Sequence, residues 1–223
     1  MPSPPNLLND DGSASMATMF MMSHHAFRRD LGRFAKALRG LAGNAARASA
    51  LREEWTKFQG ALHGHHHVED TGMFPSMRQQ HPEQASIIDG LAADHRKIDP
   101  LLERGNAAFG KLPDTADALA VVTELTQLLT PHLATEEAEL IPHIRSAKEF
   151  PAPPDEAMAG MYAEGFAWSS HGVAPDIVAK VFEMLPPILA SRLPAAVSAF
   201  EARCERVWGS AQAGATRTSI PAE

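Results

Sequence analysis

The same polar phrase occurs twice in this chain, each time inside a segment that has the apolar periodicity of a buried helix. His65-x-x-x-Glu69 and His132-x-x-x-Glu136 place an imidazole and a carboxylate four residues apart, and this spacing puts both side chains on one face of a helix. In both segments that face is the apolar one. Such groups are costly to bury unless they pair with each other or bind cations. The phrase therefore predicts helices that use core positions for metal ligands.

Two other segments show the same apolar stripe with a single interruption, by His24 in the first and by His95 in the second. Along the chain, one His is followed by the His-x-x-x-Glu phrase, and this order then occurs a second time. In both copies an acidic residue follows the Glu, and a proline lies six residues after it. Such repetition indicates a duplicated unit. We predict an all-α fold: an up-down-up-down four-helix bundle of two duplicated helical hairpins, with a C-terminal helical extension.

Glycine and proline residues divide the chain into segments. We expect a disordered tail over residues 1–14, the bundle over 15–148, a helical extension over 149–210 and a second disordered tail over 211–223. The bundle helices are expected over residues 15–39, 44–70, 82–110 and 114–147. Shorter helices are expected in the extension, over residues 155–166, 175–185 and 187–208. Because the extension is apolar, we expect it to pack on the bundle or to form a homodimer with a second subunit.

Composition and charge exclude several classes of function. The chain has 20 Lys and Arg against 27 Asp and Glu, so it lacks the basic surface of a nucleic-acid-binding protein. It has no uninterrupted apolar segment long enough to span a membrane, and its first residues lack the apolar stretch of a signal peptide. The single cysteine, Cys204, fits a reducing compartment. We therefore expect a cytoplasmic protein that binds neither nucleic acid nor membrane.

The side chains in the stripes make up one set of candidate metal ligands. The set has four imidazoles and two carboxylates, from His24, His65, Glu69, His95, His132 and Glu136. It is too large for one tetrahedral zinc ion, and it is too rich in nitrogen for calcium or magnesium. It suits two first-row metal ions, most naturally iron or manganese, with carboxylates that can bridge them. The Glu-x-x-His phrase of ferritin-like di-iron bundles is absent from the sequence.

The helix pattern His24, His65-x-x-x-Glu69, His95, His132-x-x-x-Glu136 resembles that of the hemerythrin-like, or HHE cation-binding, domain. The local stretch from His24 to Leu31, which reads His-His-Ala-Phe-Arg-Arg-Asp-Leu, is also similar. The resemblance covers about residues 15–148. It implies a four-helix bundle around two non-haem iron ions with an oxo or hydroxo bridge, and manganese and zinc remain alternatives. It also implies that dioxygen, peroxide or nitric oxide is the small ligand.

The chain departs from the dioxygen carriers of this family on two helices. The carriers have His-x-x-x-His on the third helix, where this chain has His95-x-x-x-Asp99. They have His-x-x-x-x-Asp on the fourth, where this chain offers Glu136 or Glu137. We expect Glu136, which lies on the stripe, to be the ligand, and Glu137 to support the site from behind. Asp99 is the candidate replacement for the missing imidazole. That exchange makes the site more anionic, which stabilises ferric iron and favours redox turnover over reversible oxygen carriage.

Two further histidines lie beside the stripes. His66 follows His65 and flanks the stripe, so it is a candidate to orient Glu69 or to bind metal itself. His25 is an alternative to His24.

Two classes of function remain open. The leading hypothesis is a di-iron protein that binds and reacts with dioxygen or small oxidants, which includes a peroxide-consuming enzyme or an oxygen-dependent oxidase. The alternative is a non-catalytic sensor of oxygen, iron or redox state, or a metal store. A structural zinc bundle is a third interpretation. Catalytic turnover separates the first class from the others.

Overall fold

The computed structural model describes residues 6–211, and within this range the chain is helical and has no β-strand. The chain divides into two compact units. We call Phe27–Leu140 the bundle unit, and Met1–Ala26 together with Ile141–Glu223 the extension unit. Helix α1 (Met16–Arg39) contributes to both. This division differs from the expected boundary at residues 148 and 149, because the first part of α1 belongs with the C-terminal helices.

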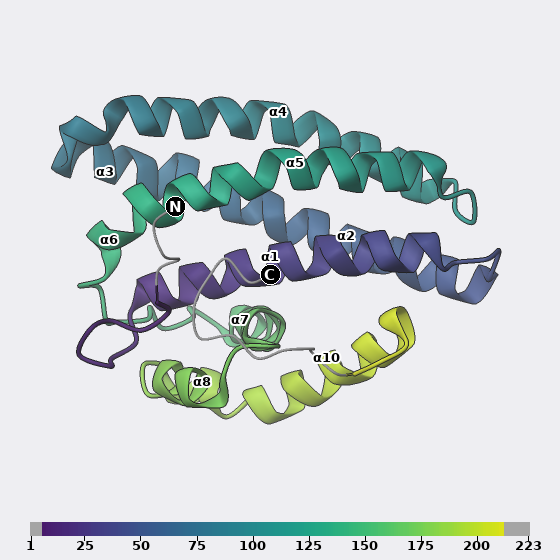
Figure 1. Cartoon of the computed structure of the whole chain (residues 1–223). Coiled ribbons are helices and arrows are strands. Elements are labelled where there is room, and N and C mark those ends of the chain that lie inside the picture. Colours follow the sequence, from purple (N-terminus) through teal and green to yellow (C-terminus); the bar gives the residue numbers. More distant parts are fainter. Residues whose placement is uncertain (1–5, 212–223) are drawn as a thin grey trace. The chain divides into compact units, whose positions relative to one another are not determined.

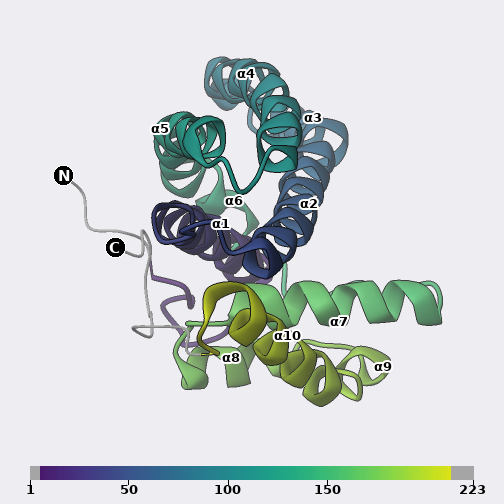
Figure 2. The ribbon, with the colours of Figure 1, turned by 90° about the vertical axis from the view of Figure 1, so that its right-hand side faces the viewer.

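The bundle unit consists of antiparallel helices joined by short loops (Figures 1 and 2). Its four long helices are the second part of α1, α2 (Ala45–Val68), α4 (Ala85–Gly110) and α5 (Ala116–Glu139). Three short elements lie between α2 and α4: a π-helical turn η1 (Glu69–Met73), helix α3 (Phe74–Gln80) and a 3₁₀ turn η2 (Pro82–Gln84). The predicted all-α fold, a four-helix bundle followed by C-terminal helices, is confirmed.

The ends of the bundle helices follow from local chemistry. Asn44 caps α2, as its side-chain oxygen accepts a 3.0 Å hydrogen bond from the backbone N–H of Arg47. The second helix does not stop near residue 70 but passes through η1 into α3. The fourth was expected to reach residue 147, but α5 ends at Glu139 and a short helix α6 (Ile141–Ile144) follows. Pro142 accounts for this break, since it has no N–H to continue the helix.

An aromatic cluster fills the core of the bundle unit between its two short interhelical loops. Phe34, Trp55 and Phe109 come from three different helices, and the Trp55 and Phe109 rings stack with centroids 4.4 Å apart. Trp55 also donates a 2.9 Å hydrogen bond to the side chain of Asn106. Phe58 joins the same cluster through contacts with Phe34 and Trp55. These large rings bury much apolar area, so they help to hold the helices in register.

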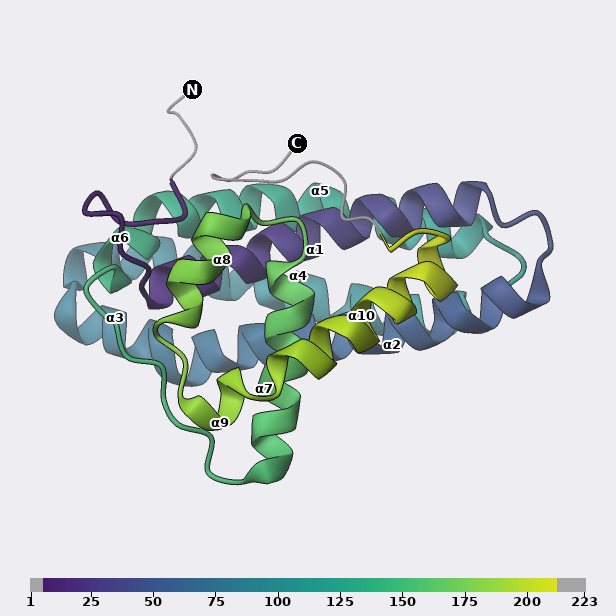
Figure 3. The ribbon, with the colours of Figure 1, turned by 90° about the horizontal axis from the view of Figure 1, so that it is seen from below.

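The extension unit has its own apolar core and contains the last helices of the chain (Figure 3). These are α7 (Glu156–Ser170), α8 (Pro175–Phe182), α9 (Pro187–Ala190) and α10 (Leu193–Trp208), and α7 packs against α9 and α10. The single helix expected over residues 187–208 is two helices. Pro194 lies in the first turn of α10, and the residue before a proline disfavours continued helix.

Part of the expected N-terminal tail is ordered. Leu7 is fully buried in the core of the extension unit. Arg145 donates hydrogen bonds to the backbone oxygens of Asn6 and Leu8, at 2.8 and 3.2 Å. The expectation of disorder over residues 1–14 is therefore wrong for residues 6–14, because burial of Leu7 and the hydrogen bonds from Arg145 help to hold the segment. Residues 1–5, and all but the first residue of the tail expected over 211–223, lie outside the described range.

Among the described residues, no helix combines the length and the hydropathy needed to cross a membrane.

We predict opposite effects for two glycine-to-alanine substitutions in α4. A Cβ at Gly105 would lie 2.0 Å from the Trp55 ring, and the stacked ring cannot move aside, so Gly105→Ala should destabilise the protein by about 1–3 kcal/mol. A Cβ at exposed Gly90 would meet no heavy atom within 4 Å, so Gly90→Ala should stabilise the protein by roughly 0.5–1 kcal/mol. Chemical denaturation of both variants measures this, and equal effects would contradict the packing argument.

Candidate metal centre

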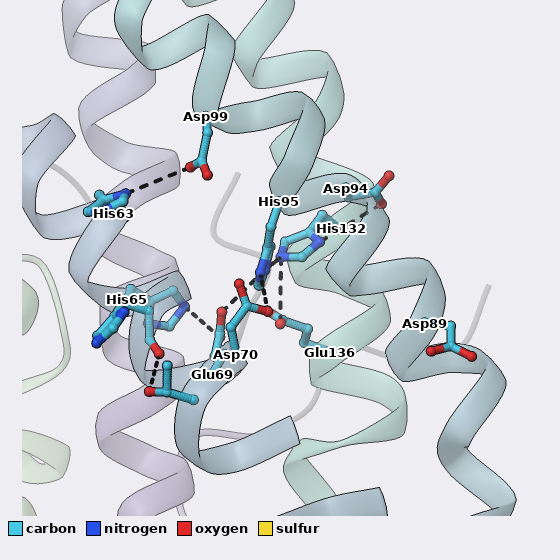
Figure 4. A network of polar contacts seen from close by, with 12 residues as sticks. His63, His65, Glu69, Asp70, Asp89, Asp94, His95, Asp99, His132 and Glu136 are labelled. Atoms are coloured by element: carbon cyan, nitrogen blue, oxygen red, sulfur yellow. Dashed lines mark hydrogen bonds and ion pairs between the residues drawn. The ribbon is translucent and has the colours of Figure 1, made fainter. Parts of the chain in front are cut away.

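Five of the buried polar side chains in the bundle unit are the candidate metal ligands, and each is at most 2% exposed. They come from α2, η1, α4 and α5, and they are His66, Glu69, His95, His132 and Glu136. His65 lies beside them with a side chain that is 10% exposed. The labelled members of this set converge in Figure 4, where His65, Glu69, His95, His132 and Glu136 point toward one another. A bundle core is an ordinary place for such a cluster.

One group of ligand atoms contains three imidazoles and one carboxylate. Suitable atoms of His66, Glu69, His95 and His132 all lie within 4.8 Å of one another. The Nε2 atom of His95 lies 3.3 Å from Nε2 of His132 and 3.4 Å from Oε2 of Glu69. The rings of His66 and His95 stack with centroids 4.0 Å apart. Four donors at this separation can hold a single first-row metal ion.

A second group shares Glu69 with the first. Suitable atoms of His65, Glu69 and Glu136 also lie within 4.8 Å of one another. Nε2 of His65 lies 3.0 Å from Oε1 of Glu69, whereas the other oxygen of this carboxylate faces His95. Glu136 also lies near the first group, since its Oε1 is 3.5 Å from Nε2 of His132. Glu69 is therefore placed to bridge two metal ions.

His24, the sixth predicted ligand, is a fully buried residue of α1 in the extension unit. Its ring packs edge-on against Phe20, with centroids 4.8 Å apart. It precedes Phe27 by three residues on the same helix face, and the Phe27 ring lies 5.3 Å from the ring of His65. His24 stays a predicted ligand.

Burial sets the protonation of this cluster. It raises the pKa of both Glu69 and Glu136 well above the ordinary range, because two carboxylates in a dry core lack the solvation that favours their charge. Burial lowers the pKa of His65 to about 4 and also lowers the pKa of His95. Neutral imidazoles can offer lone pairs to a metal, and carboxylates in this setting need either protons or cations. The donors therefore fit metal ions.

The structure places two of the secondary candidates outside both groups. Asp99 has a half-exposed side chain whose carboxylate faces His63 and lies 3.8 Å from its Nδ1 atom (Figure 4). Asp99 lies one helical turn from His95, but its carboxylate belongs to neither group, so the structure gives no support to the expectation that it replaces an imidazole. His25 belongs to the extension unit, where its Nε2 lies 3.2 Å from the backbone oxygen of His171.

Glu137 is also outside both groups, and the structure shows what holds it. Its two carboxylate oxygens accept hydrogen bonds of 2.5 and 3.1 Å from Arg28 of α1. The pair is buried, with side chains 2% and 8% exposed. Burial raises the pKa of Glu137, and the bonded guanidinium opposes this rise. Arg28 therefore keeps this acid behind the stripe, next to Glu136.

The structure places His66 in the first group of candidate ligands, although the sequence favoured its neighbour His65. A helix advances about 100° per residue, so the phase of the stripe favours only one of two consecutive histidines. The cluster is wide enough to take both, one in each group. His66 belongs to the first group, which therefore contains three imidazoles although α4 contributes only His95.

Sequence reasoning missed Asp70 and the turn that carries it. Oδ1 of Asp70 lies 3.0 Å from Nδ1 of His95. Asp70 belongs to the π-helical turn η1, in which the backbone N–H of Phe74 bonds to the oxygen of Glu69 five residues earlier. Turns of this type often occur at functional sites. The sequence did contain one indication of Asp70, because an acidic residue follows the Glu in both copies of the repeat.

We predict that His66 is needed for full metal binding and that the adjacent His67 is not. His67 is exposed on the next position of α2, so His67→Ala is a matched control for His66→Ala. Loss of one of four donors should lower the affinity of the first group by at least about tenfold. Metal titration of both variants measures this difference. Equal affinities would show that His66 is only a core residue.

Metal binding should also release protons, and it should tighten as pH rises. The raised pKa values of Glu69 and Glu136 mean that the metal-free carboxyls hold protons at pH values where an ordinary glutamate is ionised. A cation must displace these protons, and increasing pH removes that competition. His65, with a pKa of about 4, adds no competing proton near neutrality. Calorimetry in buffers of different ionisation enthalpy measures the release, which Glu136→Gln should reduce.

The comparison with protein families agrees with this geometry. The family model of the hemerythrin HHE cation binding domain matches residues 15–144, a stretch that contains every residue of both groups. Searches of curated proteins and of solved structures found no match. Because the matched stretch is more than half of the chain, the protein belongs to the hemerythrin HHE cation-binding family.

Proposed function

We propose that this protein holds two iron ions in the bundle and uses them to bind and react with dioxygen or a small oxidant such as peroxide or nitric oxide. The observation that carries the proposal is the sharing of Glu69 between two groups of donors. One ion would lie among His66, His95, His132 and Glu69. The other would take His65, Glu136 and Glu69, with His24 of α1 as a further proposed ligand.

The donor types support iron or manganese over structural zinc. The two groups contain imidazoles and carboxylates and no thiolate, a mixture that suits iron and manganese more than structural zinc. Neither group fills six positions around each ion, and open positions distinguish a reactive metal site from a structural one. Two iron ions bound in this way supply one-electron and two-electron chemistry with small oxidants.

The protein's own side chains would prepare the site in two ways. The ring of Phe74 stacks on His95 with centroids 5.5 Å apart, and Phe27 packs on His65. These apolar walls exclude water and strengthen electrostatic interactions inside the cluster. The carboxylates of Glu69 and Glu136 would neutralise part of the added positive charge.

The position of His66 changes the expected reactivity. The expected exchange of an imidazole for Asp99 made the site more anionic and disfavoured reversible oxygen binding. Since His66 occupies the cluster instead, the donors no longer favour the ferric state for that reason. Reversible binding and redox turnover are therefore both within the proposal, and a turnover assay separates them.

One contact favours a sensor as the second candidate function. His25, the neighbour of the proposed ligand His24, lies 3.2 Å from the backbone oxygen of His171 at the end of α7. A change at His24 would reach α7 through this contact. A protein of this kind would show stoichiometric spectral change without consuming its ligand.

We predict that the aerobically purified protein contains about two irons per chain, the number the two donor groups imply, with visible absorption typical of ferric iron. Glu69→Ala should lose both ions, because Glu69 belongs to both groups. Glu53→Ala, an exposed glutamate on α2, is the matched control and should keep them. Metal analysis and absorption spectra measure this.

The same samples decide between the two functions. Sustained consumption of peroxide or dioxygen by the control and not by Glu69→Ala supports an enzyme, whereas a single stoichiometric spectral change supports a carrier or sensor. A colourless protein with one metal ion or none, unaffected by Glu69→Ala, would overturn the di-iron proposal.

A further inference from the structure

Asp70 contacts the edge of His95 that faces away from the cluster. Its Oδ1 lies 3.0 Å from Nδ1 of His95, while Nε2 of the same ring faces Glu69 and His132. An ionised carboxylate has only acceptor atoms, so the hydrogen lies on Nδ1, which donates the hydrogen bond that Asp70 accepts. A neutral imidazole has a single N–H, and this contact therefore leaves the lone pair of Nε2 directed into the cluster.

The aromatic rings stacked on His95 fix the plane of its ring but not its tautomer. The rings of His66 and Phe74 both stack on it, each tilted by 16°. Stacking restrains tilt, yet it allows the proton to lie on either nitrogen. At Nδ1, the hydrogen bond to Asp70 favours the tautomer that carries its hydrogen on this nitrogen.

A second acid, Asp94, lies near another histidine of this group but farther away. Nδ1 of His132 lies 3.9 Å from Oδ2 of Asp94, which is beyond hydrogen-bonding distance. Asp94 also accepts a 2.7 Å hydrogen bond from Lys97, so part of its charge is already neutralised. Asp70 is therefore the acid best placed to control a ligand of this group.

We propose that Asp70 is a positioning residue that fixes the tautomer of His95 and thereby sets the metal affinity of the group formed by His66, Glu69, His95 and His132. This inference rests on the proposed metal centre. A carboxylate behind a metal-binding histidine orients the ring and makes the ligating nitrogen more basic, and its loss usually costs about 10–100-fold in affinity. Glu69 and Asp70 are consecutive residues of the turn η1. In this proposal Glu69 would bind the metal, and Asp70 would hold the ligand His95.

The test is titration of the metal-free, full-length protein with Co²⁺, whose visible absorption reports the ligands around it. Asp70→Ala should bind one of the two equivalents about 10–100-fold more weakly than wild type, with an altered spectrum. Asp70→Asn should have an affinity between those of wild type and Asp70→Ala, because its amide oxygen can still accept a hydrogen bond from the Nδ1–H of His95. Asp89→Ala is the matched control: Asp89 is an exposed acid of α4 paired with Arg78, and its loss should leave Co²⁺ binding unchanged.

Thermal unfolding of the metal-free variants shows whether each one folds, and if Asp70→Ala does not, Asp70→Asn decides the question. A folded Asp70→Ala protein that binds both equivalents as tightly as wild type would overturn the role of Asp70. Failure of the wild-type protein to bind Co²⁺ or iron would instead overturn the proposed metal centre, so the two failures are distinguishable.

Discussion

The burial of Glu69 is the constraint on which the polar end of the bundle depends. Its carboxylate is 0% exposed and lies close to a second buried carboxylate, that of Glu136. Two such charges cannot be kept in an apolar core without protons or cations. Cations among the surrounding imidazoles would supply that charge, which makes metal binding and the stability of this end of the bundle one linked equilibrium.

The aromatic cluster explains how the fold tolerates such a core. Trp55, Phe34 and Phe109 pack at the end of the bundle unit that contains the two short interhelical loops, while Glu69 and His132 lie beyond them along α2 and α5. The aromatic cluster therefore lies in the half of the bundle unit near the two short loops, and the candidate metal ligands lie in the other half. The aromatic half holds the helices in register. The half with the candidate ligands can therefore carry polar side chains in its core.

Sequence periodicity was enough to predict the helical fold and most of the residues that cluster in the bundle. A stripe at steps of three and four identifies which face is buried, so a His or Glu on that face, such as His95 or Glu136, is predicted to lie inside. The same periodicity undervalued His66, because it treats each stripe as one residue wide. Asp99 was a candidate only through the comparison with the dioxygen carriers, not through periodicity. Periodicity also could not foresee η1, since a π turn arises from tertiary packing that no local pattern specifies. The order of residues 6–14 depends on long-range bonds from Arg145 and was equally hidden.

The two copies of the repeat have diverged in a way that only the structure explains. In the first copy a second His-x-x-x-acid phrase, His66 to Asp70, is offset by one residue from His65 and Glu69, and both of its members contact His95. In the second copy the offset positions are Leu133 and Glu137, and Glu137 is bonded to Arg28 instead. The first hairpin therefore surrounds the histidine of the second with polar contacts, whereas the second directs its offset acid to an arginine. A pair of metal ions in this bundle would occupy chemically different positions, one richer in imidazole and one richer in carboxylate, even though the helices that carry them are repeats.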